Sequence, residues 1–90
     1  MNDPVDDSAV RRKRLRFRSW HRGTREMDIL LGRFADARLE SLSPPQLDRF
    51  ETLLHNSDPD LFGWITGASP VPEADDHDVM RLLREFSLKT

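Results

Sequence analysis

The amino-acid sequence predicts an all-α protein, a compact five-helix bundle with short loops. Apolar residues recur at spacings of three and four along most of the chain. Capping residues, prolines and glycines separate these periodic segments. No run of β-branched residues alternates with period two, as a half-buried strand requires. Because 90 residues form one domain, we assign residues 1–8 to a disordered acidic tail and residues 9–88 to a single helical domain.

The first two helices are expected to meet near Gly23. The first begins after Asp7 or Ser8, either of which can cap it, and Gly23 ends it. Its thin apolar face is assigned to Val10, Phe17 and Trp20. The second helix runs from about residue 25 to about residue 39. Its buried stripe is assigned to Met27, Leu30, Leu31, Phe34 and Ala37. Gly32 inside this helix lets another helix approach closely.

The third helix has the clearest start signal. Ser43 caps it, Pro44 takes the first helical position and Gln46 completes a capping box. Its buried face is assigned to Leu47, Phe50, Leu53 and Leu54.

The last two helices follow the same logic. Asp58 is expected to cap the fourth helix, ahead of Pro59, and Gly67 to end it. Its apolar residues are Leu61, Phe62, Trp64 and Ile65. The fifth helix is expected to start between residues 73 and 76, with a core stripe of Val79, Met80, Leu82, Leu83 and Phe86.

Charge is distributed unevenly along the chain. The net charge is −2, yet eight basic residues and no acid lie between Arg11 and Arg25. Such a positive end steers association with an acidic partner. The run Arg11–Arg18 also suits nucleic-acid phosphates, but a solvated helix face is the more common outcome, and no nucleic-acid-binding motif accompanies it. We therefore expect no nucleic-acid partner.

Composition argues against several classes of function. The chain contains no cysteine, and no segment approaches the length of apolar sequence that spans a bilayer. The acidic N-terminus does not resemble a secretory signal. We expect a cytoplasmic, monomeric bacterial protein without membrane insertion.

Catalytic and ligand-binding motifs are also missing. There is no serine nucleophile elbow, no glycine-rich phosphate loop and no dinucleotide fingerprint. The acidic run 75–78 is interpreted as charge that complements a helix dipole, not as a metal site. We therefore predict a protein that is not an enzyme and that binds no metal and no stable cofactor of its own.

The segment Arg22-Gly23-Thr24-Arg25-Glu26 allows two interpretations. From spacing alone it is a helix junction, with glycine for the turn. Alternatively, the missing glycine side chain lets a partner backbone approach, flanked by the Arg22 donor and the Glu26 acceptor. On this second hypothesis the candidate partner-binding residues are Arg22, Gly23 and Glu26 at the centre, with Arg25, Asp28 and Arg18 beside them.

This segment resembles the Arg-Gly-x-x-Glu signature of the SdhE family, small bacterial flavinylation factors for succinate dehydrogenase that are related to the mitochondrial assembly factor. The segments 27–31 and 58–65 also match, and the resemblance covers about residues 11–86. It implies a five-helix fold. It also implies binding to the flavoprotein subunit of succinate dehydrogenase, or of fumarate reductase, and promotion of covalent FAD attachment to a histidine of that partner. The alternative is a regulatory interaction module of the antitoxin-like type.

Overall fold

The computed structural model describes residues 7–89 and confirms the all-α prediction. Within this range there are five α-helices, two 3-10 turns and no strand. The elements are α1 (Asp7–Trp20), α2 (Arg25–Arg38), η1 (Leu39–Ser41), α3 (Pro44–Leu53), α4 (Asp58–Thr66), η2 (Glu73–Asp75) and α5 (Asp78–Lys89). The expected disordered tail lies outside the described residues except at positions 7 and 8, which already belong to α1.

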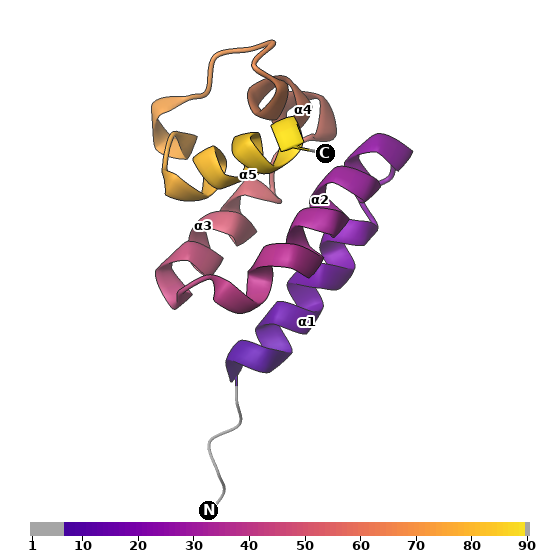
Figure 1. The fold of residues 1–90 in the computed structure, drawn as a ribbon, viewed down its shortest axis with the longest axis vertical. Coiled ribbons are helices and arrows are strands. Elements are labelled where there is room, and N and C mark those ends of the chain that lie inside the picture. Colours follow the sequence, from indigo (N-terminus) through magenta and orange to yellow (C-terminus); the bar gives the residue numbers. More distant parts are fainter. Residues whose placement is uncertain (1–6, 90) are drawn as a thin grey trace, which may run out of the picture.

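The helices form two neighbouring groups (Figure 1). α1 and α2 run side by side as a long antiparallel hairpin, and α4 and α5 pack together beyond α3. The loop between α1 and α2 therefore lies close to the start of α4, although about 35 residues separate the two in sequence.

A single hydrophobic core joins both groups. The Phe34 ring lies at its centre, with ring centroids 5.6 Å from Phe50 and 5.7 Å from Phe86. The predicted stripes of α3 and α5 face this core. One assignment was wrong, because Ala35 and not Ala37 is the buried alanine of α2. Of the apolar residues of α4, Leu61, Trp64 and Ile65 are buried, whereas Phe62 is 45% exposed.

Capping at the helix starts is confirmed for α3 and differs for α4. Ser43 and Gln46 form the complete capping box. The cap of α4 is Ser57, whose hydroxyl accepts from the Asp60 backbone N–H, so the prediction of Asp58 was wrong by one residue. Gly67 ends α4 in the left-handed conformation, as expected. The fifth helix starts later than expected, at Asp78, because the segment that precedes it forms η2.

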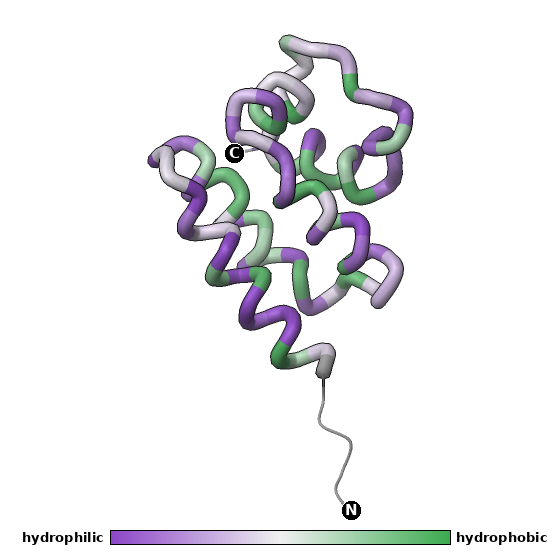
Figure 2. Tube along the Cα trace, turned by 180° about the vertical axis from the view of Figure 1, so that it is seen from behind, coloured by the Kyte–Doolittle hydropathy of each residue, from purple (hydrophilic) through white to green (hydrophobic). Residues whose placement is uncertain are grey.

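The apolar face predicted for α1 is wrong for Val10 and Phe17, whereas Trp20 is half-buried and packs against Gly32 of α2. Val10 is 53% exposed and Phe17 is 63% exposed, whereas Leu15 and Ser19 are fully buried. Figure 2 shows α1 as hydrophilic over most of its length. The Ser19 hydroxyl donates to the Leu15 carbonyl at 2.8 Å, so this polar side chain is satisfied inside the core. A small residue at this position allows α1 to lie close to its neighbours.

Arginines, not an apolar stripe, orient α1. Arg11 bonds Asp48 at 2.6 Å and Glu51 at 2.8 Å on α3. These contacts raise the pKa of Arg11 and, led by the Arg11 hydrogen bond, lower the pKa of Glu51 below its ordinary value. Arg12 donates to the carbonyls of Leu39 and Leu42. The arginines of this run thus join α1 to the rest of the protein.

Gly32 of α2 lies directly against the Trp20 indole of α1, in agreement with the close approach of another helix that the sequence predicted. A Cβ atom added there would lie 2.1 Å from Cδ2 of Trp20. We expect Gly32→Ala to lower the free energy of unfolding by about 2 kcal/mol, because overpacking outweighs the gain of about 1 kcal/mol in helix propensity. Urea unfolding measures this change.

The matched control is Gly32→Ala in a Trp20→Ala background. Without the indole ring, only the helix propensity of alanine remains, so the substitution should then be stabilising. If Gly32→Ala stabilises the protein with Trp20 present, the ring does not limit this position.

Candidate functional site

The conformation of the loop between α1 and α2 is fixed by Gly23 and by hydrogen bonds from nearby backbone N–H groups to the side chains of Asp28 and Thr24. Gly23 has φ +121°, which residues with side chains rarely adopt. The Asp28 carboxylate accepts from the backbone N–H of Arg22 at 2.5 Å and of Gly23 at 3.3 Å. Thr24 caps α2 by accepting from the Met27 N–H. The predicted site residue Asp28 therefore shapes the loop from the inside.

Arg22 points into the protein, with a side chain only 11% exposed. Its Nε donates to Asp58 Oδ1 at 2.8 Å. Its two Nη atoms donate to the carbonyls of Leu54 at 2.5 Å and Asn56 at 2.6 Å. All three acceptors lie at the junction of α3 and α4. The expectation that Arg22 offers a free donor beside Gly23 was wrong, because its guanidinium is occupied by this junction.

The remaining residues of the 22–26 motif face outward. A Cβ atom on Gly23 would meet nothing within 4 Å, so the surface there is open. Arg25 and Glu26 are exposed, and the side chain of neither takes part in an ion pair or hydrogen bond among residues 7–89. Arg25 also occupies the first position of α2, where the helix dipole disfavours a cation by roughly 0.3–1 kcal/mol. An unpaired charge at an unfavourable position is typical of a binding surface.

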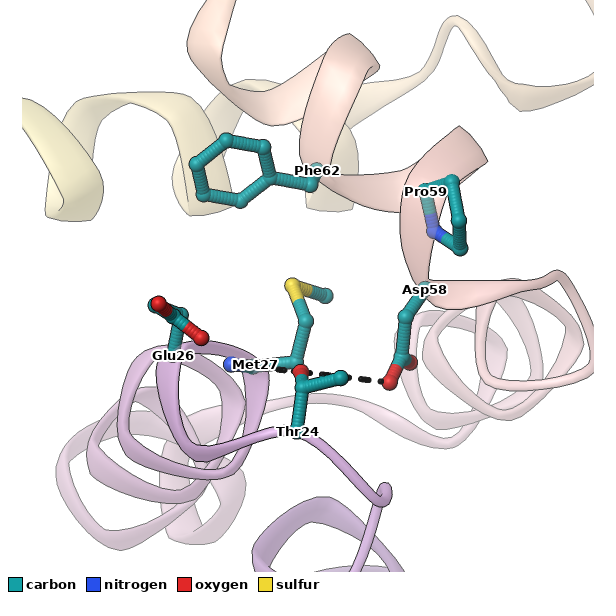
Figure 3. A pocket seen from close by; sticks show the side chains of 6 residues that line it. All are labelled: Thr24, Glu26, Met27, Asp58, Pro59 and Phe62. Carbon is teal, nitrogen blue, oxygen red and sulfur yellow. Dashed lines mark hydrogen bonds between the residues drawn. The ribbon is translucent and has the colours of Figure 1, made fainter.

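A hollow of about 290 Å³ opens beside Glu26 (Figure 3). Its lining comes from the start of α2 and the start of α4, namely Thr24, Glu26, Met27, Asp58, Pro59 and Phe62. The Thr24 hydroxyl donates to Asp58 Oδ2 at 3.4 Å across its edge. Since Met27, Pro59 and Phe62 supply the apolar part, the hollow suits an apolar side chain with a polar neighbour.

The structure brings together four of the predicted site residues in the loop and the first turn of α2, namely Gly23, Arg25, Glu26 and Asp28. Arg22 supports them from the interior. Arg18 is separate, because its guanidinium lies 3.6 Å from Glu51 on α3. Whether each of these residues contacts a partner stays a prediction.

Sequence reasoning missed the contribution of α4 to this site. Asp58, Pro59 and Phe62 belong to the segment 58–65, which resembles the SdhE family, yet none of them is among the predicted site residues. The signal in the sequence was Phe62. Adjacent residues of a helix point in different directions, so when Leu61 faces the core, Phe62 points away from it toward the surface.

Other candidate sites have structural explanations. In the run 75–78, Asp78 bonds Gln46 at 3.0 Å and Arg49 at 3.0 Å, and its pKa is lowered, chiefly by the Gln46 contact. Residues 7–89 contain no group of side chains placed to hold a metal ion. Over the same range, no helix is both long and apolar enough to cross a membrane.

In the basic run, Arg11, Arg12, Arg16 and Arg18 have acceptors inside the protein, which leaves few free cations for phosphates.

Comparison with known proteins adds independent information. A family model described as flavinator of succinate dehydrogenase matches residues 13–87. The FAD assembly factor SdhE of Acetobacter pasteurianus is 40% identical over 82 residues, which cover 91% of this chain and 75% of that protein. The mitochondrial succinate dehydrogenase assembly factor 2 of Dictyostelium discoideum is 36% identical over 84 residues, covering 93% of this chain and 60% of the relative. Its counterpart in Danio rerio is 38% identical over 80 residues, covering 87% and 51%. The chain thus spans only half to 60% of these mitochondrial relatives.

Proposed function

Because this chain belongs to the family of succinate dehydrogenase flavinators, we propose that it binds the flavoprotein subunit of succinate dehydrogenase and promotes covalent attachment of FAD to it. The names of its bacterial and mitochondrial relatives, FAD assembly factor and succinate dehydrogenase assembly factor, support this function. Fumarate reductase, a second flavoprotein target expected from the resemblance, belongs to the same proposal.

The observation that carries the proposal is the exposed half of the 22–26 motif. Gly23 leaves an open surface, and Glu26 presents a carboxylate that has no ion-pair partner among residues 7–89 beside an apolar hollow. A partner that supplies an apolar side chain and a donor fits this combination. Arg22 and Asp28 keep the loop in place for that contact.

The proposed mechanism is binding without chemistry by this chain. The flavin and the histidine that it joins both belong to the partner. The factor binds the partner conformation that holds these groups in reactive geometry, and its differential affinity raises the population of that conformation. Holding reacting atoms in place removes much of the entropic part of a barrier. Neither a catalytic residue nor a cofactor of this chain is then required. The cytoplasmic location and monomeric state expected from the sequence stay predictions.

Co-expression tests the proposal. The flavoprotein subunit is produced with and without this chain in a host that lacks its own factor, and flavin fluorescence is read in denaturing gels. We expect fluorescence of the flavoprotein band to rise several-fold when the chain is present, for succinate dehydrogenase and in a parallel arm for fumarate reductase. Equal fluorescence without the chain contradicts the proposal. Recovery of a toxin, and of no flavoprotein, in affinity capture favours the regulatory alternative.

A further inference from the structure

The hollow at Glu26 continues into a second one along α2. This second hollow, of about 510 Å³, shares Glu26 and Phe62 with the first. Its lining also includes Ile29, Leu30, Arg33, Thr66, Phe86 and Ser87, from α2, α4 and α5. The two hollows adjoin at Glu26 and Phe62, and we call them together the α2–α4 groove. Figure 3 shows the Phe62 ring projecting from α4 into the space above Glu26 and Met27.

The α2 wall of this groove has a regular pattern. Glu26, Leu30 and Arg33 are spaced by four and three residues, so they share one face of the helix. At 1.5 Å per residue, Glu26 and Arg33 are roughly 10 Å apart along the axis, which is two helical turns. The half-buried Leu30 lies between an acid at one position and a base at the other.

Both charges are free to pair with a partner. Glu26 and Arg33 are exposed, and neither forms an ion pair with another residue in the range 7–89. Phe62, on the opposite wall, keeps 45% of its surface exposed to water. Covering an aromatic ring and matching two opposite charges would both favour binding of a segment along this groove.

The walls decide what kind of segment fits. Helices form both walls, and the backbone groups of a helix interior already bond within the helix. The groove therefore has no free edge to pair with an extended strand, which favours a segment that satisfies its own backbone hydrogen bonds. A helix does so, and it presents side chains at the same two-turn spacing. A phosphate-bearing ligand fits poorly, because Glu26 and Asp58 place carboxylates at one end.

We propose that the α2–α4 groove binds one amphipathic helix of the flavoprotein partner. That helix carries a basic residue opposite Glu26, an acidic residue about seven positions away opposite Arg33, and apolar side chains between them that pack on Phe62 and Leu30. This inference rests on the proposed function and adds to it the kind of partner segment that is recognised.

Photo-crosslinking tests whether the partner segment that binds in the groove is a helix. A benzoyl-phenylalanine replaces Phe62 in the full chain, the complex with the flavoprotein subunit is irradiated, and the joined peptides are identified by mass spectrometry. We expect crosslinks to residues three or four apart on one partner helix. Crosslinks to a second copy of this chain or to a non-helical segment would overturn the proposal, and so would a complex that forms without any crosslink at this position.

Charge reversal tests the predicted register. Arg33→Glu should weaken binding to the flavoprotein roughly tenfold, and reversing the acid on the crosslinked helix should restore it.

The matched control for the aromatic contact is Phe17→Ala, since Phe17 is 63% exposed and lies on α1 outside the groove. Phe62→Ala should weaken binding at least tenfold, while Phe17→Ala leaves it unchanged. An equal loss in both variants would overturn the assignment.

The two proposals fail in different ways. If Arg33→Glu and Phe62→Ala bind normally while the wild-type chain still raises covalent flavin, the groove proposal falls and the proposed function stands. If the wild-type chain has no effect on covalent flavin, the proposed function falls, whatever the groove binds.

Discussion

Replacing Arg22 with alanine should lower the free energy of unfolding by about 3 kcal/mol, because it leaves Asp58 without its cation in a site where both side chains are largely buried. The carbonyls of Leu54 and Asn56 lose their donors in the same step. For a domain of this size, whose total stability is on the order of 5–10 kcal/mol, this is a large fraction. Urea unfolding followed by far-ultraviolet circular dichroism measures it.

A double-mutant cycle isolates the ion pair from the other bonds of Arg22. Arg22→Ala, Asp58→Ala and the double variant should be clearly non-additive, because each single substitution already removes the shared interaction. Arg22→Lys is the control for charge alone. A lysine carries its three donors on a single nitrogen and cannot reproduce the spread of Nε, Nη1 and Nη2, so it should recover only part of the loss. Additive effects would show that Arg22 and Asp58 act independently.

Replacing Gly23 with arginine should abolish the increase in covalent flavin that this chain produces in co-expression. The Cβ of the new side chain would meet nothing within 4 Å, and the rest of the side chain would obstruct close approach of a partner backbone. The fold should survive, since the main internal cost is the strain of a side chain at φ +121°, about 1–3 kcal/mol. In-gel flavin fluorescence and a binding assay give the readout.

Gly67→Ala is the matched control for backbone strain. Gly67 also has a positive φ, +86°, and a Cβ atom there makes only an ordinary contact with Arg84. It should lose about 1 kcal/mol of stability and keep full activity in flavin attachment. If Gly23→Arg leaves covalent flavin at the wild-type level, the docking surface is wrongly assigned. If Gly67→Ala also loses activity, general destabilisation explains the effect.

Together these two variants divide the 22–26 motif into two parts. Arg22 faces inward and fixes the loop against the start of α4, whereas Gly23 and Glu26 face outward beside the hollow. We therefore expect Arg22→Ala to reduce both stability and binding, and Gly23→Arg to abolish binding with a smaller loss of stability. Adjacent residues of this motif thus have different roles: Arg22 stabilises the loop, and Gly23 belongs to the surface proposed to contact the partner.

Local signals in the sequence predicted the local features well. The capping box at Ser43 and Gln46, the αL end of α4 at Gly67 and the close contact at Gly32 are all confirmed. Each depends on residues within one or two turns, or on the absence of a side chain. The errors arose where distant residues decide, as in α1, whose buried face is set by Leu15 and Ser19 and by arginines that reach α2 and α3.

The sequence by itself determined the helices, the core stripes of α3 and α5 and the presence of a distinctive motif at the first loop, because periodicity and turn chemistry are local properties. Only the tertiary structure decided what each motif residue does. The sequence does not indicate which acids or carbonyls accept hydrogen bonds from Arg22. The packing of α1 and α2 against α3 and α4 makes Asp58, Leu54 and Asn56 the acceptors. The same packing brought Phe62 beside Glu26 and formed the groove. Such contacts depend on how helices distant in sequence pack, which the spacing of residues within one helix does not encode.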